Sequence, residues 1–286
     1  EESHILDKTE WDAFVNRHNG TLFNLSSYLD ATAEHWLVIW NEQKTGGIPI
    51  SYAIKAGQLV AVTPLFARYL EWVGADFDPK ALFDFLQQHF AVGDLNVKND
   101  FGFGEKKHFQ KLALGDLSLN QQAKRSLKKA TSFTISSEDR FEDLNSLLQS
   151  ELAKRVSSIN ALSLMKLEAL VKKTSNLKIK QLNLWNEGKW CGAVLYIEAT
   201  DHLLYLKGTV KAEERKNGGM YRLIYQLIQL AFESNKHLDF GGSNVENVRR
   251  FNCSFGAKDE EYTSLSWNHA PAWWKGLRWL KSRLRN

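Results

Sequence analysis

The chain has 286 residues, of which 43% are hydrophobic and 24% are charged, and this composition excludes extended disorder. A formal net charge of +4 is small for this length, so any electrostatic hold on a polyanion must come from a local patch. Two cysteines, with no Cys or His cluster at metal-ligand spacing, exclude a disulfide scaffold and argue against a zinc module. We therefore expect no metal and a reducing, cytoplasmic setting.

The apolar runs of the sequence are too short for a membrane span. The longest, 36–40 and 192–197, have the length of strands, whereas a spanning helix needs roughly 20 apolar residues. The first residues show neither a basic n-region nor an apolar h-region, so we predict no secretory signal. Membrane contact, if used, is expected to be peripheral and at the inner face.

The first half begins with a helix and continues as a β-meander. Trp11, Phe14 and Val15 fall at helical spacing, and Gly20 ends the pattern. Runs rich in β-branched and aromatic residues then predict three antiparallel strands, followed by an apolar-periodic helix and two short strands. The predicted strands are 35–40, 48–55, 59–64, 95–98 and 108–114, and the helix is 79–90.

The second half repeats this order of elements. Three strands joined by short turns come first, then a long helix, a short strand, a shorter helix and a last strand. In chain order these are 177–185, 189–199, 202–210, 218–233, 238–240, 244–255 and 262–267. The recurrence predicts an α/β (α+β) fold of two similar units, each a mixed, mostly antiparallel sheet with flanking helices.

Helical pattern fills 120–130 and 142–175, between the halves. We place an N-terminal domain at 1–118, a C-terminal domain at 119–270 and a basic amphipathic helix at 271–286. This last helix mixes tryptophan with lysine and arginine, and we expect it to pack on the N-terminal domain. The alternatives to this packing are contact of the helix with an anionic membrane surface and contact with a partner.

The strand at 202–210 runs into a glycine-containing loop that opens the long helix. Such a loop presents unpaired N–H groups and the positive end of the helix dipole, a seat for phosphate or pyrophosphate. The glycines let a ligand approach the backbone, and the cations add charge beside it. A plain loop and helix start is the simpler alternative. The predicted donor-binding residues are Arg215, Lys216, Asn217, Gly218, Gly219 and Met220.

Four stretches resemble known transferases. Arg215 to Met220 resembles the pyrophosphate loop of GNAT acyltransferases, although Met220 stands where that pattern has a small residue. His237-Leu-Asp-Phe-Gly-Gly-Ser243, followed by Val248-Arg-Arg-Phe-Asn-Cys-Ser-Phe-Gly256-Ala, resembles the closing segment of FemAB-like peptidoglycan aminoacyltransferases and their acetyltransferase relatives. Lys124-Arg-Ser-Leu-Lys-Lys129 and the opening Trp11-Asp-Ala-Phe-Val15 are similar to the same family. The resemblance covers nearly the whole chain and implies two GNAT-like domains, the second with the donor loop.

The resemblance implies a transferase without a tightly bound cofactor. It would move an acyl group from acetyl-CoA or another acyl-CoA, or an aminoacyl group from aminoacyl-tRNA, to an amine acceptor such as a peptidoglycan precursor. The donor would lie in the splay between the strands at 202–210 and 238–240. Catalysis there is mostly positioning, with proton removal and stabilisation of an oxyanion. The polar candidates for these roles are Asp239, Tyr205, Ser243 and Tyr262.

The polar candidates, and the cysteine and histidines near them in the sequence, also have simpler interpretations. Asp239 can cap local backbone, and the tyrosines can be core residues. Cys253 has the neighbours of a small buried hydrophobe rather than of a nucleophile. Three histidines, His108, His202 and His237, have no partner at a spacing typical of a triad or a metal site.

The helix at 120–130 carries two i,i+4 pairs of like charge, which repel unless they are solvated or face an anion. A solvated face is the simpler interpretation, and contact with tRNA phosphates or an anionic acceptor is the functional one. A transferase fold that only holds an envelope precursor or a protein partner is the alternative to an enzyme. Nucleic-acid binding by base stacking is weaker, because the aromatic residues fall on core faces. The basic residues are Lys124, Arg125, Lys128 and Lys129.

Overall fold

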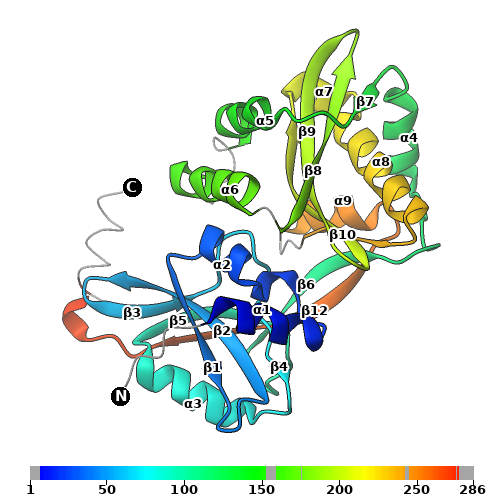
Figure 1. The fold of residues 1–286 in the computed structure, drawn as a ribbon. Coiled ribbons are helices and arrows are strands. Elements are labelled where there is room, and N and C mark those ends of the chain that lie inside the picture. Colours follow the sequence, from blue (N-terminus) through cyan, green and yellow to red (C-terminus); the bar gives the residue numbers. More distant parts are fainter. Residues whose placement is uncertain (1–6, 153–158, 175, 242–244, 275, 277–286) are drawn as a thin grey trace. The chain divides into compact units, whose positions relative to one another are not determined.

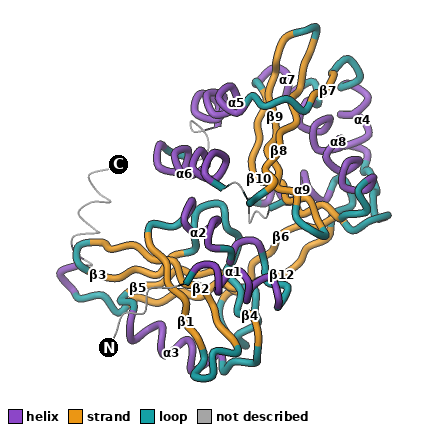
Figure 2. Tube along the Cα trace, in the orientation of Figure 1, coloured by secondary structure: helices purple, strands orange, loops and turns teal. Residues whose placement is uncertain are grey.

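The structure is a computed structural model that describes residues 7–152, 159–174, 176–241, 245–274 and 276. The chain forms two compact units, 1–107 with 261–286, and 108–260. Figure 1 colours them along the sequence, and Figure 2 shows their strands in orange and their helices in purple.

The limits of the two units fall inside strands. β6 (Glu105–Leu112) and β12 (Lys258–Asn268) each begin in one unit and end in the other. The boundaries expected from the sequence, after 118 and 270, lie outside these strands. Turn and helix patterns cannot locate a boundary within a strand, because both parts of the strand have the same periodicity.

The first unit is a mixed sheet with helices on both faces. Its strand order is β1-β2-β3-β5-β12, with β4 beside β2; β3 and β5 are parallel and the other pairs are antiparallel. Alternate residues of β1 divide between the two faces, so Trp36, Val38 and Trp40 meet the first helix. The elements are α1 (Lys8–Arg17), a 3-10 turn (Leu22–Asn24), α2 (Ser26–Thr32), β1 (His35–Trp40), β2 (Gly46–Lys55), β3 (Gln58–Val62), β4 (Val73–Gly74), α3 (Pro79–His89) and β5 (Val92–Val97).

Local sequence explains where the helices of this unit begin. The side chains of Asp7 and Asp78 each accept hydrogen bonds from the first turn of the helix that follows, and Pro79 occupies a first-turn position where no donor is needed. The other face of the sheet packs on α3 through Leu82 and Leu86.

The second unit has the strand order β6-β11-β10-β9-β8-β7, in which β10 and β11 are parallel. In Figure 1 its sheet separates α8 and α4 from α5 and α6. Its elements are α4 (Gln121–Lys129), β7 (Thr134–Ser136), α5 (Phe141–Leu147), a π-helical turn (Leu148–Leu152), α6 (Ala161–Lys173), β8 (Lys178–Asn186), β9 (Lys189–Glu198), β10 (His202–Val210), α7 (Ala212–Lys216), α8 (Gly219–Glu233), β11 (His237–Asp239) and α9 (Glu246–Cys253).

The core of the second unit lies between its sheet and α8. One stripe of α8 is fully buried against β8, β9 and β10, which holds the start of that helix firmly. The buried residues of this stripe are Leu223, Ile224, Leu227, Ile228 and Ala231.

The segment 142–175, in which helical pattern is predicted, contains more than one helical element. The structure has α5, the π-helical turn and then α6. Asn160 starts α6 with a capping box, because its side chain accepts from the Ser163 N–H and the Ser163 hydroxyl accepts from the Asn160 N–H. The pair is visible in the sequence as a new helix start, although no glycine or proline marks the break.

Candidate functional site

Two parallel strands diverge in the second unit. β10 and β11 pair over three positions, the last being Leu204 with Asp239. β11 ends there, while β10 continues to Val210 and bulges between Tyr205 and Lys207 in its register against β9. Among the described residues, 205–210 of β10 therefore have no strand partner on the β11 side. The divergence lies where the resemblance places the donor.

Asp239 and Tyr205 lie at this divergence, and both have structural partners. Buried Asp239 accepts a hydrogen bond from the Gly241 N–H at 2.8 Å. Gly241 has φ +80°, and a Cβ there would lie 2.5 Å from the Tyr205 carbonyl oxygen, so only glycine lets the chain turn this close to β10. Asp239 therefore orders the turn that closes one side of the divergence.

The Tyr205 ring packs against the core beneath α8, and its hydroxyl lies 3.5 Å from the Gly208 carbonyl oxygen across the bulge. Burial raises the pKa of Tyr205 well above the usual range of a phenol. The side chain is therefore a neutral phenol near neutral pH, which can donate but not remove a proton.

Of the other two predicted catalytic residues, one belongs to the first unit and one is outside the described residues. Tyr262 belongs to the first unit, where it is buried on β12 with its ring centroid 6.0 Å from that of Tyr69. Ser243 lies outside the described residues. Within the second unit, the structure brings together Asp239 and Tyr205 of the four.

The predicted donor loop is a corner between two helices. It comprises the end of α7, Asn217, and Gly218 as the cap of α8 at φ +87°. A Cβ at Gly218 would lie 2.3 Å from the Ser126 carbonyl oxygen, and one at Gly219 would lie 2.8 Å from Leu184. The two glycines therefore allow close packing of α4 and β8 around the start of α8.

The remaining residues of this loop point in different directions. Arg215 donates to the Val210 carbonyl oxygen at 3.0 Å and lies 3.7 Å from Glu151, so it secures the end of β10. Lys216 and Asn217 are exposed, whereas Met220 packs against the core. A role of these residues in donor binding stays a prediction.

The predicted basic helix, α4, presents four exposed cations. Its buried side is small, since Ala123 and Ser126 face the protein and Ser126 touches Gly218 as described. This places the cations on an outer face beside the start of α8. We call it the α4 cationic face, and its residues are Lys124, Arg125, Lys128 and Lys129.

The structure brings together two histidines that are far apart in the sequence and have no spacing typical of a triad or a metal site. His202 and His237 are directly paired on β10 and β11, and their rings stack with centroids 5.1 Å apart. His202 Nδ1 lies 2.8 Å from Asp201 Oδ1, and candidate ligand atoms of all three residues lie within 4.8 Å of one another. Sequence spacing does not reveal this grouping, because parallel pairing joins residues that are far apart in the sequence.

This pair makes the stability of the fold depend on pH. Burial, reinforced by the charge of Lys111, lowers the pKa of His237 to about 4. The folded state thus binds fewer protons than the unfolded state between about pH 6.5 and pH 4. The free energy of unfolding should fall through that window as the pH falls. The free energy of unfolding, measured by urea denaturation at about pH 7.5 and pH 4.5, should decrease between these pH values in both proteins. The decrease in His237→Gln should be smaller than in wild type by on the order of 1 kcal/mol.

His269→Gln, a change at an exposed histidine of the first unit, is the control for this measurement. Its free energy of unfolding should decrease between the two pH values as much as that of wild type. If His237→Gln showed the same decrease as wild type, the pH dependence would not come from His237.

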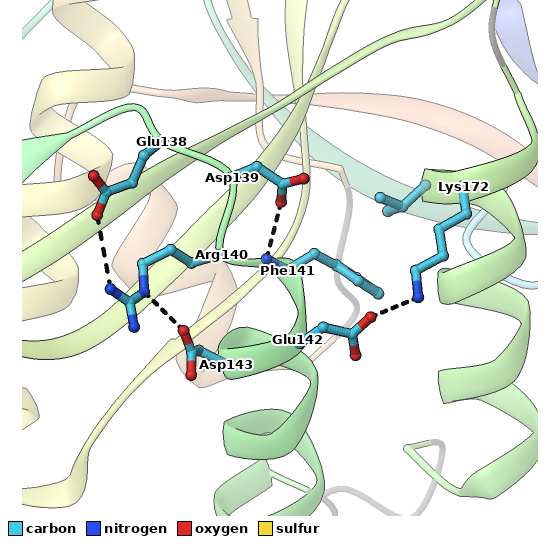
Figure 3. A pocket seen from close by; sticks show the side chains of 8 residues that line it. Glu138, Asp139, Arg140, Phe141, Glu142, Asp143 and Lys172 are labelled. Carbon is cyan, nitrogen blue, oxygen red and sulfur yellow. Dashed lines mark hydrogen bonds and ion pairs between the residues drawn. The ribbon is translucent and has the colours of Figure 1, made fainter.

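A cavity of 730 Å³ opens between the start of α5 and α6, and Figure 3 shows the side chains around it. Arg140 bridges Glu138 and Asp143, at 3.9 Å and 2.7 Å. Lys172 of α6 pairs with Glu142, and this contact raises the pKa of the lysine. The charged groups are thus largely matched to one another, and none of the predicted site residues lines this cavity.

A second cavity, of 900 Å³, lies in the first unit between α1 and β1. Phe14, Trp36 and Trp40 give it an aromatic wall, and acidic and basic side chains stand at its rim. None of its lining residues was predicted from the sequence to take part in chemistry.

The start of the segment expected to form the C-terminal helix is visible. Trp274 is buried against Val60 and Val92 of the first unit, and its indole donates to the Lys55 carbonyl oxygen at 2.8 Å. Residues 277–286, which include most of its basic residues, lie outside the described residues. No helix among the described residues has the length and apolar character needed to cross a membrane.

Several solved structures share this fold. FemX superposes with a TM-score of 0.60 at 14% identity, over 92% of this chain and 96% of its own. L-PGS from Bacillus licheniformis gives 0.55 at 16%, over 95% of each chain. The C-terminal domain of a putative lysylphosphatidylglycerol synthetase from Agrobacterium fabrum gives 0.53 at 11%, over 97% of each. No family model and no curated protein matches the sequence.

These likenesses show that the chain has a FemX-like fold. The mixed α/β class inferred from the sequence is confirmed, and the resemblance to FemAB-like proteins is confirmed at the level of the fold.

Proposed function

We propose that this protein is a transferase that moves an aminoacyl group from its tRNA to an amine. The divergence of β10 and β11 in a FemX-like fold carries the proposal, because it opens the edge of one strand beside the start of a rigid helix. A bound donor can replace the missing strand partner there. The name of one protein with this fold describes a lysylated lipid as its product. The proposed acceptor class is an amine-bearing envelope precursor, as the FemAB-like resemblance of the sequence implies.

Two features favour aminoacyl-tRNA over acyl-CoA as the donor. A Cβ added at Gly218 or Gly219 would come within 2.3 Å of the Ser126 carbonyl oxygen or 2.9 Å of the Glu214 carbonyl oxygen, so a pyrophosphate close to these glycines on that side would meet hydrogen-bond acceptors rather than donors. The α4 cationic face, by contrast, is exposed and lies beside that helix start. A row of exposed cations suits the regularly spaced phosphates of a polynucleotide.

The reaction at this site is an aminolysis. The acceptor nitrogen attacks the carbonyl carbon of the ester, so a C–N bond forms and the carbonyl π electrons move to oxygen. Collapse of this intermediate breaks the ester C–O bond, and the ribose oxygen leaves with the proton that the amine loses. The protein contributes mainly by positioning and by stabilising the oxyanion.

Charge reversal on α4 tests the donor. Lys124→Glu with Lys128→Glu should weaken binding of aminoacyl-tRNA about 10-fold or more and flatten its salt dependence, because fewer counterions are released. Fluorescence anisotropy with labelled tRNA over a salt series measures both. Lys55→Glu with Lys80→Glu applies the same charge change to exposed residues of the first unit and should leave binding nearly unchanged.

Transfer itself is measured with radiolabelled aminoacyl-tRNA and amine-bearing envelope precursors. Formation of a labelled amide, lost in the α4 variant and kept in the control, supports the proposal. Equal tRNA binding by all variants, together with a rise in melting temperature on adding acetyl-CoA, would instead show an acyl-CoA donor.

A further inference from the structure

A lysine stands at the bulge where β10 leaves β11. Lys207 pairs in register with Leu195 of β9, and the next residue, Gly208, pairs with Val194. Val194 belongs to the core beneath α8. Because side chains alternate along a strand, Lys207 lies on the opposite face of the sheet from α8. α5 and the π-helical turn pack against β10 on that face.

Lys207 is half-buried, and its ammonium makes no hydrogen bond or ion pair with any described residue. The acids on the neighbouring elements are engaged elsewhere. Glu151 of the π-helical turn lies 3.7 Å from Arg215, while Glu142 and Asp143 of α5 pair with Lys172 and Arg140 as above. Burial lowers the pKa of Lys207, which reflects a cation that has lost water without gaining a counter-charge.

Such a group is costly to the fold. A partly desolvated charge without a partner opposes folding, and lysines of this kind are concentrated at functional sites, where a ligand supplies the missing charge. Along β10, Lys207 lies beyond Leu204, the last residue that pairs with β11, and directly after the bulge against β9. The π-helical turn, an element often found at functional sites, also packs on β10.

We propose that Lys207 is a catalytic residue whose ammonium stabilises the oxyanion that forms on the donor carbonyl during transfer. This inference rests on the proposed function. When the amine attacks and the carbonyl π electrons move to oxygen, the negative charge develops beside a cation that none of the described residues neutralises. The charge is lost again when the C–O bond breaks. Lys207 therefore binds the transition state more strongly than the neutral ester.

Steady-state kinetics test this role in the full chain. Lys207→Met keeps an unbranched side chain that is one atom shorter and removes its charge, and kcat should fall about 100- to 1000-fold with KM for aminoacyl-tRNA changed less than about threefold. Lys207→Arg should recover part of kcat. Lys189→Met, at an exposed lysine of β9, should leave kcat unchanged. An unchanged kcat in Lys207→Met would overturn the proposal.

Stability separates this role from a structural one. Lys207→Met should raise the melting temperature, because an unmatched charge leaves a half-buried position. A lower melting temperature would show that the lysine supports the fold and would overturn the proposal.

A readout without turnover separates the two hypotheses. If the wild-type protein transfers nothing from any donor, the proposed function fails, and labelling with an acetylating N-hydroxysuccinimide ester at about pH 7.5 still examines the site. Peptide mass spectrometry should show Lys207 among the acetylated lysines, because burial lowers its pKa and favours the reactive free amine. A Lys207 that stays unlabelled would overturn the assignment of an accessible, unmatched amine.

Discussion

Replacing Gly218 by alanine should lower the free energy of unfolding by about 3 kcal/mol or more. The residue has φ +87°, a conformation that costs a non-glycine residue roughly 1 kcal/mol. The added Cβ would also lie 2.3 Å from the Ser126 carbonyl oxygen. That oxygen belongs to the backbone of α4 and cannot rotate away, so α4 must shift relative to α8.

Gly188→Ala is the matched control. Gly188 has φ +73° in the turn between β8 and β9, and a Cβ added there would meet no other atom within 4 Å. The free energy of unfolding of Gly188→Ala should therefore decrease only by the conformational cost of a positive φ, roughly 1 kcal/mol. Urea denaturation of the two variants isolates the contact with α4. Equal losses would show that α4 does not pack against Gly218 in this way.

The second large effect is expected at Gln110, where leucine should cost about 3 kcal/mol. Gln110 is fully buried on β6. Its oxygen accepts from Asn252 of α9 at 2.9 Å, and its amide donates to Asp259 of β12 at 2.9 Å. Asp259 also accepts from Arg249 at 2.9 Å. Removing the central amide leaves the buried Asn252 side chain without its acceptor.

A double-mutant cycle separates this network from simple packing. Asn252→Leu alone should also destabilise, and the double variant with Gln110→Leu should lose at least about 1 kcal/mol less than the sum of the two. Thermal or urea unfolding measures all four proteins. Additive losses would mean that the two amides are not coupled. The network also explains part of the family-like segment 248–257, since Arg249 and Asn252 hold α9 to β6 and β12.

Long, regular elements could be predicted from the sequence nearly to the residue. Strand 35–40 was predicted with its observed limits, because a run of aromatic and β-branched residues ends at turn residues. Helix 79–90 ends one residue earlier than predicted, and Asp78-Pro79 marks its start. β4 and β7, which have two and three residues, were missed. α2 was missed because no side chain caps its start.

The site was predicted less completely than the fold. Asp239 could be named because it lies at the end of its strand, and Tyr205 because it is a polar residue of the strand that the resemblance places beside the donor. Lys207 could not, because its exposure depends on a bulge that the sequence of β10 does not mark. Pairing of His202 with His237 depends on the register of two parallel strands, which no local pattern specifies.

The course of β6 and β12 bears on how the protein is made. The first unit consists of 1–107 and 261–286, and β5 in this unit pairs with β12. During synthesis, all residues of the second unit leave the ribosome before β12, which completes the sheet of the first unit. The second unit can therefore complete its fold before the first, although in most proteins the N-terminal domain folds first. Until synthesis reaches β12, the edge of β5 is open to intermolecular pairing, and a chaperone that shields it would raise the yield of native protein.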